Sequence, residues 1–274
     1  MEIEDYVNSS PPTSSLAQIG SCLIEVDMPA PIDVYRIQSR NYLLYGTADR
    51  IAEMPALGGL LMLGLVSATE GYFRSILSAC LDMCPISRMH SVDKSINLGG
   101  VLWHGNAEFR RSAFEHMSFT SAKELKSASS GYLKFDLPGA QFDELLKNYD
   151  TICNVRHGLV HNSGILPGRN AAQIDIPKFS RPVRIDVDFA YLQSSGAVVD
   201  SLVSTFNRSL FKLMGGRWAV AWRQRADWEP DQEEEKFERI WNVFLCREEL
   251  NTRPDRADVD ASICMAAIKA ENGL

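Results

Sequence analysis

The stretch AQFDELLKNYDTICNVRHGLVH, residues 140–161, constrains the fold of this chain more than any other part of the sequence. Its apolar residues recur at three- and four-residue spacing, as they do on one face of an α-helix. A Pro-Gly pair precedes the stretch and the sequence Asn-Ser-Gly follows it, and such residues commonly flank helices. We therefore expect one long helix here and a mainly helical fold around it.

Helical apolar patterns also cover much of the chain on either side of this helix. They extend over about residues 47–82 and 188–214, and two or three shorter helices are expected between residues 92 and 137. The pieces QIDIP and VRIDVD, which follow the long helix, alternate apolar and polar residues and predict two short strands.

The expected fold class is mainly α, a helical bundle with three parts. The cluster NSSPPTSS and the sequence PAPID predict an irregular N-terminal arm, residues 1–45. The helical domain, residues 46–214, includes a short β-like insertion after the long helix. A helical C-terminal extension, residues 215–274, begins at a Gly-Gly pair and contains the acidic helix DQEEEKFERIWNVFL.

Composition limits the classes of function. The chain of 274 residues is 45% apolar and has a net charge of −7, so it can bury a large core but cannot hold nucleic acid by its overall charge. Its six cysteines include no C-x-x-C pair and are expected to be core thiols. No secretory leader is recognisable and the longest apolar run is short, so we expect a cytoplasmic protein without a membrane contact.

Two local groups of cations could still contact nucleic acid. Arg169, Lys178, Arg181 and Arg184 are opposed by only one aspartate before the VRIDVD segment begins. In RWAVAWRQRADW, arginines alternate with tryptophans, a mixture that suits phosphate pairing and base stacking. For each group, a solvated loop or a half-buried strand is the simpler interpretation.

A helical wheel of residues 140–161 places Arg156 in the middle of the apolar face. An unpaired guanidinium there costs several kcal/mol, so it must reach a carboxylate, an anion or a wet cleft. Glu70 lies on the apolar stripe of the helix expected at residues 47–82. We expect Glu70 and Arg156 to face each other between the two helices.

The same wheel places a polar stripe, which includes Asn154, His157 and His161, in a separate sector. Arg156 and His161 come out about 140° apart on an ideal helix. They would therefore flank a groove, or be brought together from two chains.

Two structural interpretations of this segment stay open. Arg156 could pair with Glu70 at a helix end where the two histidines complement the helix dipole. His157 and His161 also have the i, i+4 spacing of metal ligands, but no third ligand is identifiable and H-E-x-x-H is absent. The Arg-to-His spacing alone is weak evidence, because Arg111 and His116 repeat it.

The segment from residue 149 to residue 164 resembles the signature of HEPN domains, helical bundles in which Arg, a polar residue, a few more residues and then His lie on a late helix. Here these residues are Arg156, His157 and His161, followed by Asn162. The stretch ATEGYFRSIL is similar to an earlier HEPN helix that carries an acidic residue, which would be Glu70. The resemblance covers about residues 45–214 and implies a HEPN-like bundle.

The resemblance implies RNA cleavage without a metal or other cofactor, in a composite site formed by two HEPN domains, often in toxin–antitoxin or phage-defence systems. In that mechanism His161 would act as acid and base, and Arg156 would stabilise the phosphorane. His157, Asn154 and Asn162 would orient groups or contact RNA. The expected partners are RNA, a second copy of the chain and an antitoxin or regulatory protein.

Two other functions compete with this one. A HEPN-like module could bind RNA, nucleotides or a protein without cutting anything, and the chain could be an unrelated helical interaction protein. Other enzyme classes are less well supported, because G-x-S-x-G, a P-loop and G-x-G-x-x-G are absent.

Overall fold

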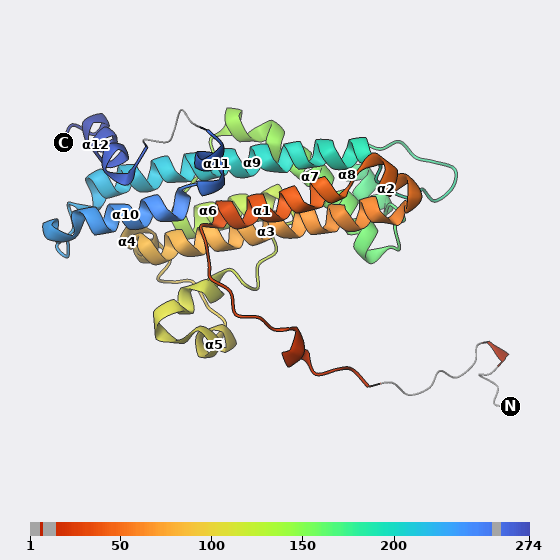
Figure 1. Cartoon of the computed structure of the whole chain (residues 1–274), viewed down its shortest axis with the longest axis horizontal. Coiled ribbons are helices and arrows are strands. Elements are labelled where there is room, and N and C mark those ends of the chain that lie inside the picture. The colour runs from red at the N-terminus through yellow and green to blue at the C-terminus, as the bar shows by residue number, and fades with distance from the viewer. Residues whose placement is uncertain (1–5, 8–14, 254–258) are drawn as a thin grey trace.

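The computed structural model describes residues 6–7, 15–253 and 259–274, and within these ranges the chain is mainly helical, as expected (Figure 1). Its α-helices are α1 (Pro31–Tyr45), α2 (Ala48–Glu53), α3 (Ala56–Met83), α4 (Pro85–His90), α5 (Leu98–Glu108), α6 (Ala122–Leu133), α7 (Gly139–His161), α8 (Gly168–Gln173), α9 (Phe189–Gly216), α10 (Glu233–Phe244), α11 (Arg247–Thr252) and α12 (Ala261–Glu271). Shorter helical turns are η2 (Ile19–Cys22), η3 (Phe109–Ala113), η4 (Arg217–Trp222) and η5 (Pro230–Gln232).

Four helices, α1, α3, α7 and α9, pack against one another around the hydrophobic core. Figure 1 shows α1, α3 and α9 running along the long axis of the molecule. Aromatic side chains fill the centre, where the Phe73 ring of α3 meets the Phe206 ring of α9 edge-on at 5.2 Å. Tyr149 of α7 meets Phe73 at 6.1 Å. Such pairs add to the free energy gained by burying the rings.

The expectation of an irregular arm as far as residue 45 is wrong for its last third. Residues 31–45 form α1, which buries Ile32 and Tyr35 against the bundle. Pro31 occupies the first turn of this helix, where proline is favoured because its missing N–H has no helical partner. Residues 15–29 are exposed and lead away from the bundle, whereas most of the Pro and Ser cluster lies outside the described residues.

The expectation of two strands after the long helix is also wrong, because the described residues contain only an isolated antiparallel bridge, between Ile165 and Arg184. Gln173 instead ends α8, and residues 174–177 leave it through a residue with positive φ, Asp175. Residues 183–188 do alternate between covered and exposed positions. Ile185 packs against Gly158 of α7 and Val187 against Gly58 of α3, however, and no other bridge in the described residues involves this segment.

The Gly215-Gly216 pair does not interrupt the helical backbone as expected. Helix α9 includes both glycines and passes directly into the π-helical turn η4, and Gly215 packs closely against Ile268 of α12. The acidic helix is present as α10, and it buries Phe237 and Ile240 in the same core as α3 and α9. The C-terminal extension is therefore an integral part of the bundle.

Helix α3 is long and apolar enough to cross a membrane by length and composition alone. In the folded chain it is the central helix and packs against α1, α7 and α9. Core helices commonly share this composition.

Candidate functional site

The first four turns of α7 are anchored in the core. Phe142, Leu146 and Tyr149 are buried, and the Tyr149 hydroxyl donates a hydrogen bond to the Phe119 carbonyl oxygen at 2.7 Å. Burial raises the pKa of both the Tyr149 hydroxyl and the nearby Cys153 thiol, so both remain protonated at neutral pH. This half of the helix is structural and positions the residues that follow it.

Arg156 lies one turn beyond this anchored part and is half-buried. Within the described residues its guanidinium has no hydrogen bond and no ion pair. The expected pair with Glu70 is wrong, because Glu70 accepts a hydrogen bond from Arg74 at 2.7 Å, one turn along α3. Arg74 is fixed there by also donating to the Met117 carbonyl oxygen. Any ion-pair partner of Arg156 would therefore come from outside the described residues.

His157 and His161 are exposed, and their rings lie 4.7 Å apart between centroids. This spacing confirms that both imidazoles lie on one face of α7, as the wheel predicts. Asn154, one turn earlier, is held in place because its side chain donates to the Asp150 carbonyl oxygen and accepts from Asn170 of α8 at 2.7 Å. Asn154 therefore fixes α8 against α7.

Asn162 follows α7 as its C-terminal cap, with its backbone N–H bonded to the Gly158 carbonyl oxygen at 3.2 Å and its side chain exposed. Gly158 allows the chain to fold back closely along the helix. A Cβ atom at this position would lie 2.5 Å from Ile185 Cδ1 and 3.3 Å from the Ile165 carbonyl oxygen. The absence of a side chain therefore brings residues 165 and 185 against the last turns of α7.

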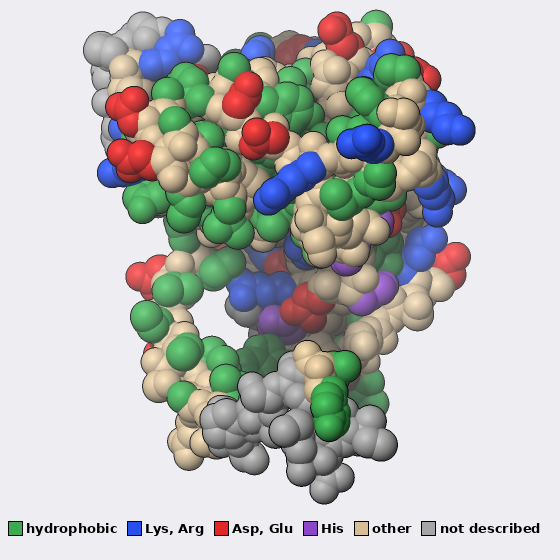
Figure 2. Space-filling view, turned by 90° about the vertical axis from the view of Figure 1, so that its right-hand side faces the viewer, with side chains coloured by type: hydrophobic (Ala, Val, Ile, Leu, Met, Phe, Trp, Pro, Cys, Tyr) green, Lys and Arg blue, Asp and Glu red, His purple; other side chains and the backbone are tan. Residues whose placement is uncertain are grey.

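The four predicted RNA-binding cations are all exposed, and none has an ion pair within the described part of the chain. Arg169 belongs to α8, which contacts α7. Arg184 forms the bridge to Ile165, and Lys178 and Arg181 lie in the segment between. Figure 2 looks onto the end of the molecule where α2 and α8 lie, and it shows Lys and Arg side chains across this face with His side chains close by.

The Arg and Trp stretch has a different role from the one considered for it. Arg217 donates to the Leu133 carbonyl oxygen at 2.7 Å, and Arg223 forms an ion pair with Glu233. Trp218 is buried against α10. These side chains hold the C-terminal helices in place.

A cavity beside the first half of α7, lined by neither His157 nor His161, could not be foreseen from the sequence. It has a volume of about 530 Å³ and lies between α6, α7 and the end of α8. Its charged lining residues are Lys126, Asp143, Lys147, Asp150 and Asp175. The polar stripe of α7 indicated only Lys147 and Asp150, because the other walls depend on how distant helices pack.

The described residues contain no cluster of three His, Cys, Asp or Glu side chains arranged to hold a metal ion. No protein-family model, curated protein or solved structure matches this chain. The resemblance to HEPN domains therefore depends on the motif around Arg156 and His161 and on the mainly helical fold.

Proposed function

We propose that this chain is a metal-independent endoribonuclease of the HEPN type, acting as a toxin or phage-defence effector. The observation that carries the proposal is Arg156, a half-buried guanidinium without a partner among the described residues, next to the face that holds His157 and His161. A half-buried cation of this kind is stabilised by an incoming anion, and the phosphate group of RNA is such an anion.

The proposed reaction needs only proton transfer and stabilisation of charge. His161 takes the proton from a ribose 2′-hydroxyl, whose oxygen attacks the adjacent phosphorus. Arg156 stabilises the additional negative charge of the phosphorane. The bond from phosphorus to the 5′-oxygen breaks, and a protonated imidazole returns a proton to that oxygen. The products are a 2′,3′-cyclic phosphate and a 5′-hydroxyl.

The site is proposed to be completed by a second copy of the chain. Arg156 and His161 are about 140° apart on an ideal helix, so a single α7 presents them on different sides. Two α7 helices meeting at their C-terminal ends would bring Arg156 of one copy toward His161 of the other. His157 and Asn162, both exposed at that end, would then contact RNA or orient it.

The exposed cations provide a local path for RNA on an otherwise acidic protein. Arg169, Lys178, Arg181 and Arg184 are proposed to contact phosphates on either side of the scissile bond. Because each phosphate contact releases counterions, RNA affinity should fall steeply as salt concentration rises.

The test is incubation of purified protein with mixed RNAs in EDTA, beside His161→Ala and Arg156→Ala variants. We expect wild-type cleavage with cyclic phosphate ends, and a loss of roughly 10²–10⁴-fold in the His161→Ala variant. His116→Ala is the matched control, because His116 is an exposed histidine at the same spacing from an arginine.

Retention of cleavage by the two α7 variants contradicts the proposal. A wild-type protein that binds RNA but leaves it intact, and whose expression does not arrest growth, favours the non-catalytic HEPN-like module instead.

A further inference from the structure

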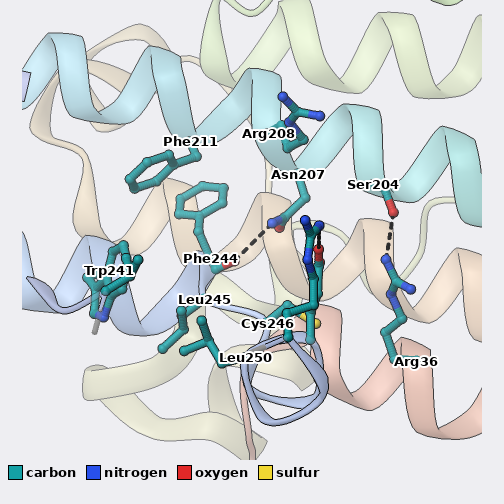
Figure 3. Close-up of a pocket in the computed structure, with 13 residues that line it drawn as sticks. Arg36, Ser204, Asn207, Arg208, Phe211, Trp241, Phe244, Leu245, Cys246 and Leu250 are labelled. Atoms are coloured by element: carbon teal, nitrogen blue, oxygen red, sulfur yellow. Dashed lines mark hydrogen bonds and ion pairs between the residues drawn. The ribbon is translucent and has the colours of Figure 1, made fainter. Parts of the chain in front are cut away.

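A second cavity lies away from α7, between α1, α9, α10 and α11 (Figure 3). Its volume of about 450 Å³ falls in the range of small-molecule sites. None of the residues proposed for RNA cleavage lines it, so it is a separate site from that of the proposed ribonuclease.

One end of the cavity is aromatic. The Phe211 ring lies 6.4 Å from the Trp241 ring and 5.6 Å from the Phe244 ring, measured between centroids. Figure 3 shows these three side chains together, with Leu245 and Leu250 below them. This end offers flat apolar surfaces, against which a planar ring packs better than a flexible alkyl chain.

The other end is cationic, and among the described residues its positive charge is not balanced. Arg208 is exposed and has neither a hydrogen bond nor an ion pair within the described residues. Arg36 donates to Ser204 Oγ at 3.0 Å and lies 3.5 Å from an Asp200 oxygen, but its buried Nε has no acceptor. Burial raises the pKa of Asp200, which is the ion-pair partner of Arg36.

Glu249 and Arg253, the other charged residues of the lining, form an ion pair with each other at 3.4 Å. This cavity has a flat apolar end and an excess of guanidinium groups. A ligand that matches it has a flat apolar part and an anionic part. Guanidinium forks bind carboxylates and phosphates particularly well.

We propose that this cavity binds a small aromatic anion, a planar ring that carries one carboxylate or phosphate group. The ring lies against Trp241 and Phe211, and the anionic group reaches Arg208 and Arg36. Neither half of such a ligand uses the whole cavity, so neither should bind well alone.

Isothermal titration calorimetry on the full chain tests this proposal with indolepropionate as the probe. Indole and propionate serve as the ring-only and anion-only arms, and decanoate as an aliphatic anion of similar charge. We expect saturable binding of indolepropionate and at least tenfold weaker binding of the other three. Indoxyl phosphate distinguishes the two anionic groups, because tighter binding than that of indolepropionate identifies a phosphate ester as the preferred class.

Two variants locate the site on helix α9. Arg208→Gln should weaken indolepropionate binding about tenfold, since hydrogen bonds to charged groups contribute about 1.5 kcal/mol or more. Lys212→Gln is the control, because it removes a cation one turn further along, outside the cavity lining. Thermal melting without ligand checks that both variants fold. Absence of indolepropionate binding at millimolar concentration, equal binding by Arg208→Gln and wild type, or preference for decanoate overturns the proposal.

Discussion

Both halves of α7 carry polar side chains, but these groups have partners within the chain in one half and lack acidic partners in the other. In the half that faces α3 and α6, the Tyr149 hydroxyl donates to Phe119 and an Asp150 oxygen accepts from the Ala122 N–H at 2.7 Å. In the half that begins at Arg156, cationic and imidazole side chains face solvent without acidic partners in the described chain. The polar groups of the first half are thus paired within the folded chain, whereas those of the second half have no acidic partner among the described residues.

The largest expected effect on stability compares a ring packed in the core with a ring near the cationic end. Phe206→Ala should lower the free energy of unfolding by about 3–5 kcal/mol, because Phe206 contacts several core rings and its removal leaves a cavity. Urea denaturation measures it. Phe179→Ala is the control near the cationic end, where the ring is 55% exposed, and its effect should be below about 1 kcal/mol. Equal losses in the two variants would show that the open end is packed as tightly as the core.

A second substitution tests how the cationic segment is held against the bundle. Gly58→Ala on α3 would place a Cβ atom 1.9 Å from the Val187 carbonyl oxygen. We expect a loss of about 1–3 kcal/mol in stability together with displacement of residues 183–188. Denaturation and backbone amide NMR shifts measure the two effects.

Gly71→Ala on the same helix is the control, because its Cβ meets no atom within 4 Å and alanine favours helix. It should stabilise the protein slightly. A Gly58→Ala variant as stable as the Gly71→Ala variant would contradict the close contact with Val187.

A third prediction concerns the satisfied half of α7. Tyr149→Phe should reduce stability by about 1–3 kcal/mol, because it leaves the buried Phe119 carbonyl oxygen without its donor. Tyr45→Phe, at a tyrosine 54% exposed, should change stability little when both variants are unfolded in urea. No difference between them would mean that water replaces the lost hydroxyl.

The smallest effect is expected at Arg156 itself. Arg156→Met should leave the free energy of unfolding unchanged or raise it by up to about 1 kcal/mol, because no intramolecular partner is lost. Arg74→Met should cost about 1–3 kcal/mol, because it leaves Glu70, only 7% exposed, without its counterion. Thermal or urea unfolding compares the two. A clear destabilisation by Arg156→Met would point to a structural role for that guanidinium.

The features predicted correctly from the sequence are those that depend on neighbours within one helix. The shared face of His157 and His161 follows from i, i+4 spacing alone, and the bounds of α7 follow from its flanking residues. The pairing of Glu70 with Arg156 failed because a wheel gives a direction around each helix but no offset along it. Besides burial, the negative charge of Glu70 raises the pKa values of Tyr149 and Cys153, which precede Arg156 on α7. The ion-pair partner of Glu70 is Arg74, on its own helix.

The errors elsewhere have similar causes. Val183, Ile185 and Val187 alternate with exposed residues as in a strand, but the surface that covers them is formed by helices that meet only in the folded chain. The Gly215-Gly216 pair predicts a helix end, but Gly215 instead makes room for the close contact with Ile268 of α12. The walls of both cavities combine distant helices, so no local pattern could indicate them.

The hydrogen bond between Asn154 and Asn170 has a consequence for the segment that carries Lys178 and Arg181. With the bridge at Arg184, it closes that segment into a loop fixed at both ends. Closing a loop removes conformational entropy from it during folding. If this loop contacts RNA phosphates as proposed, binding restricts it less than it would restrict a free cationic tail, and more of the free energy of each contact is retained as affinity.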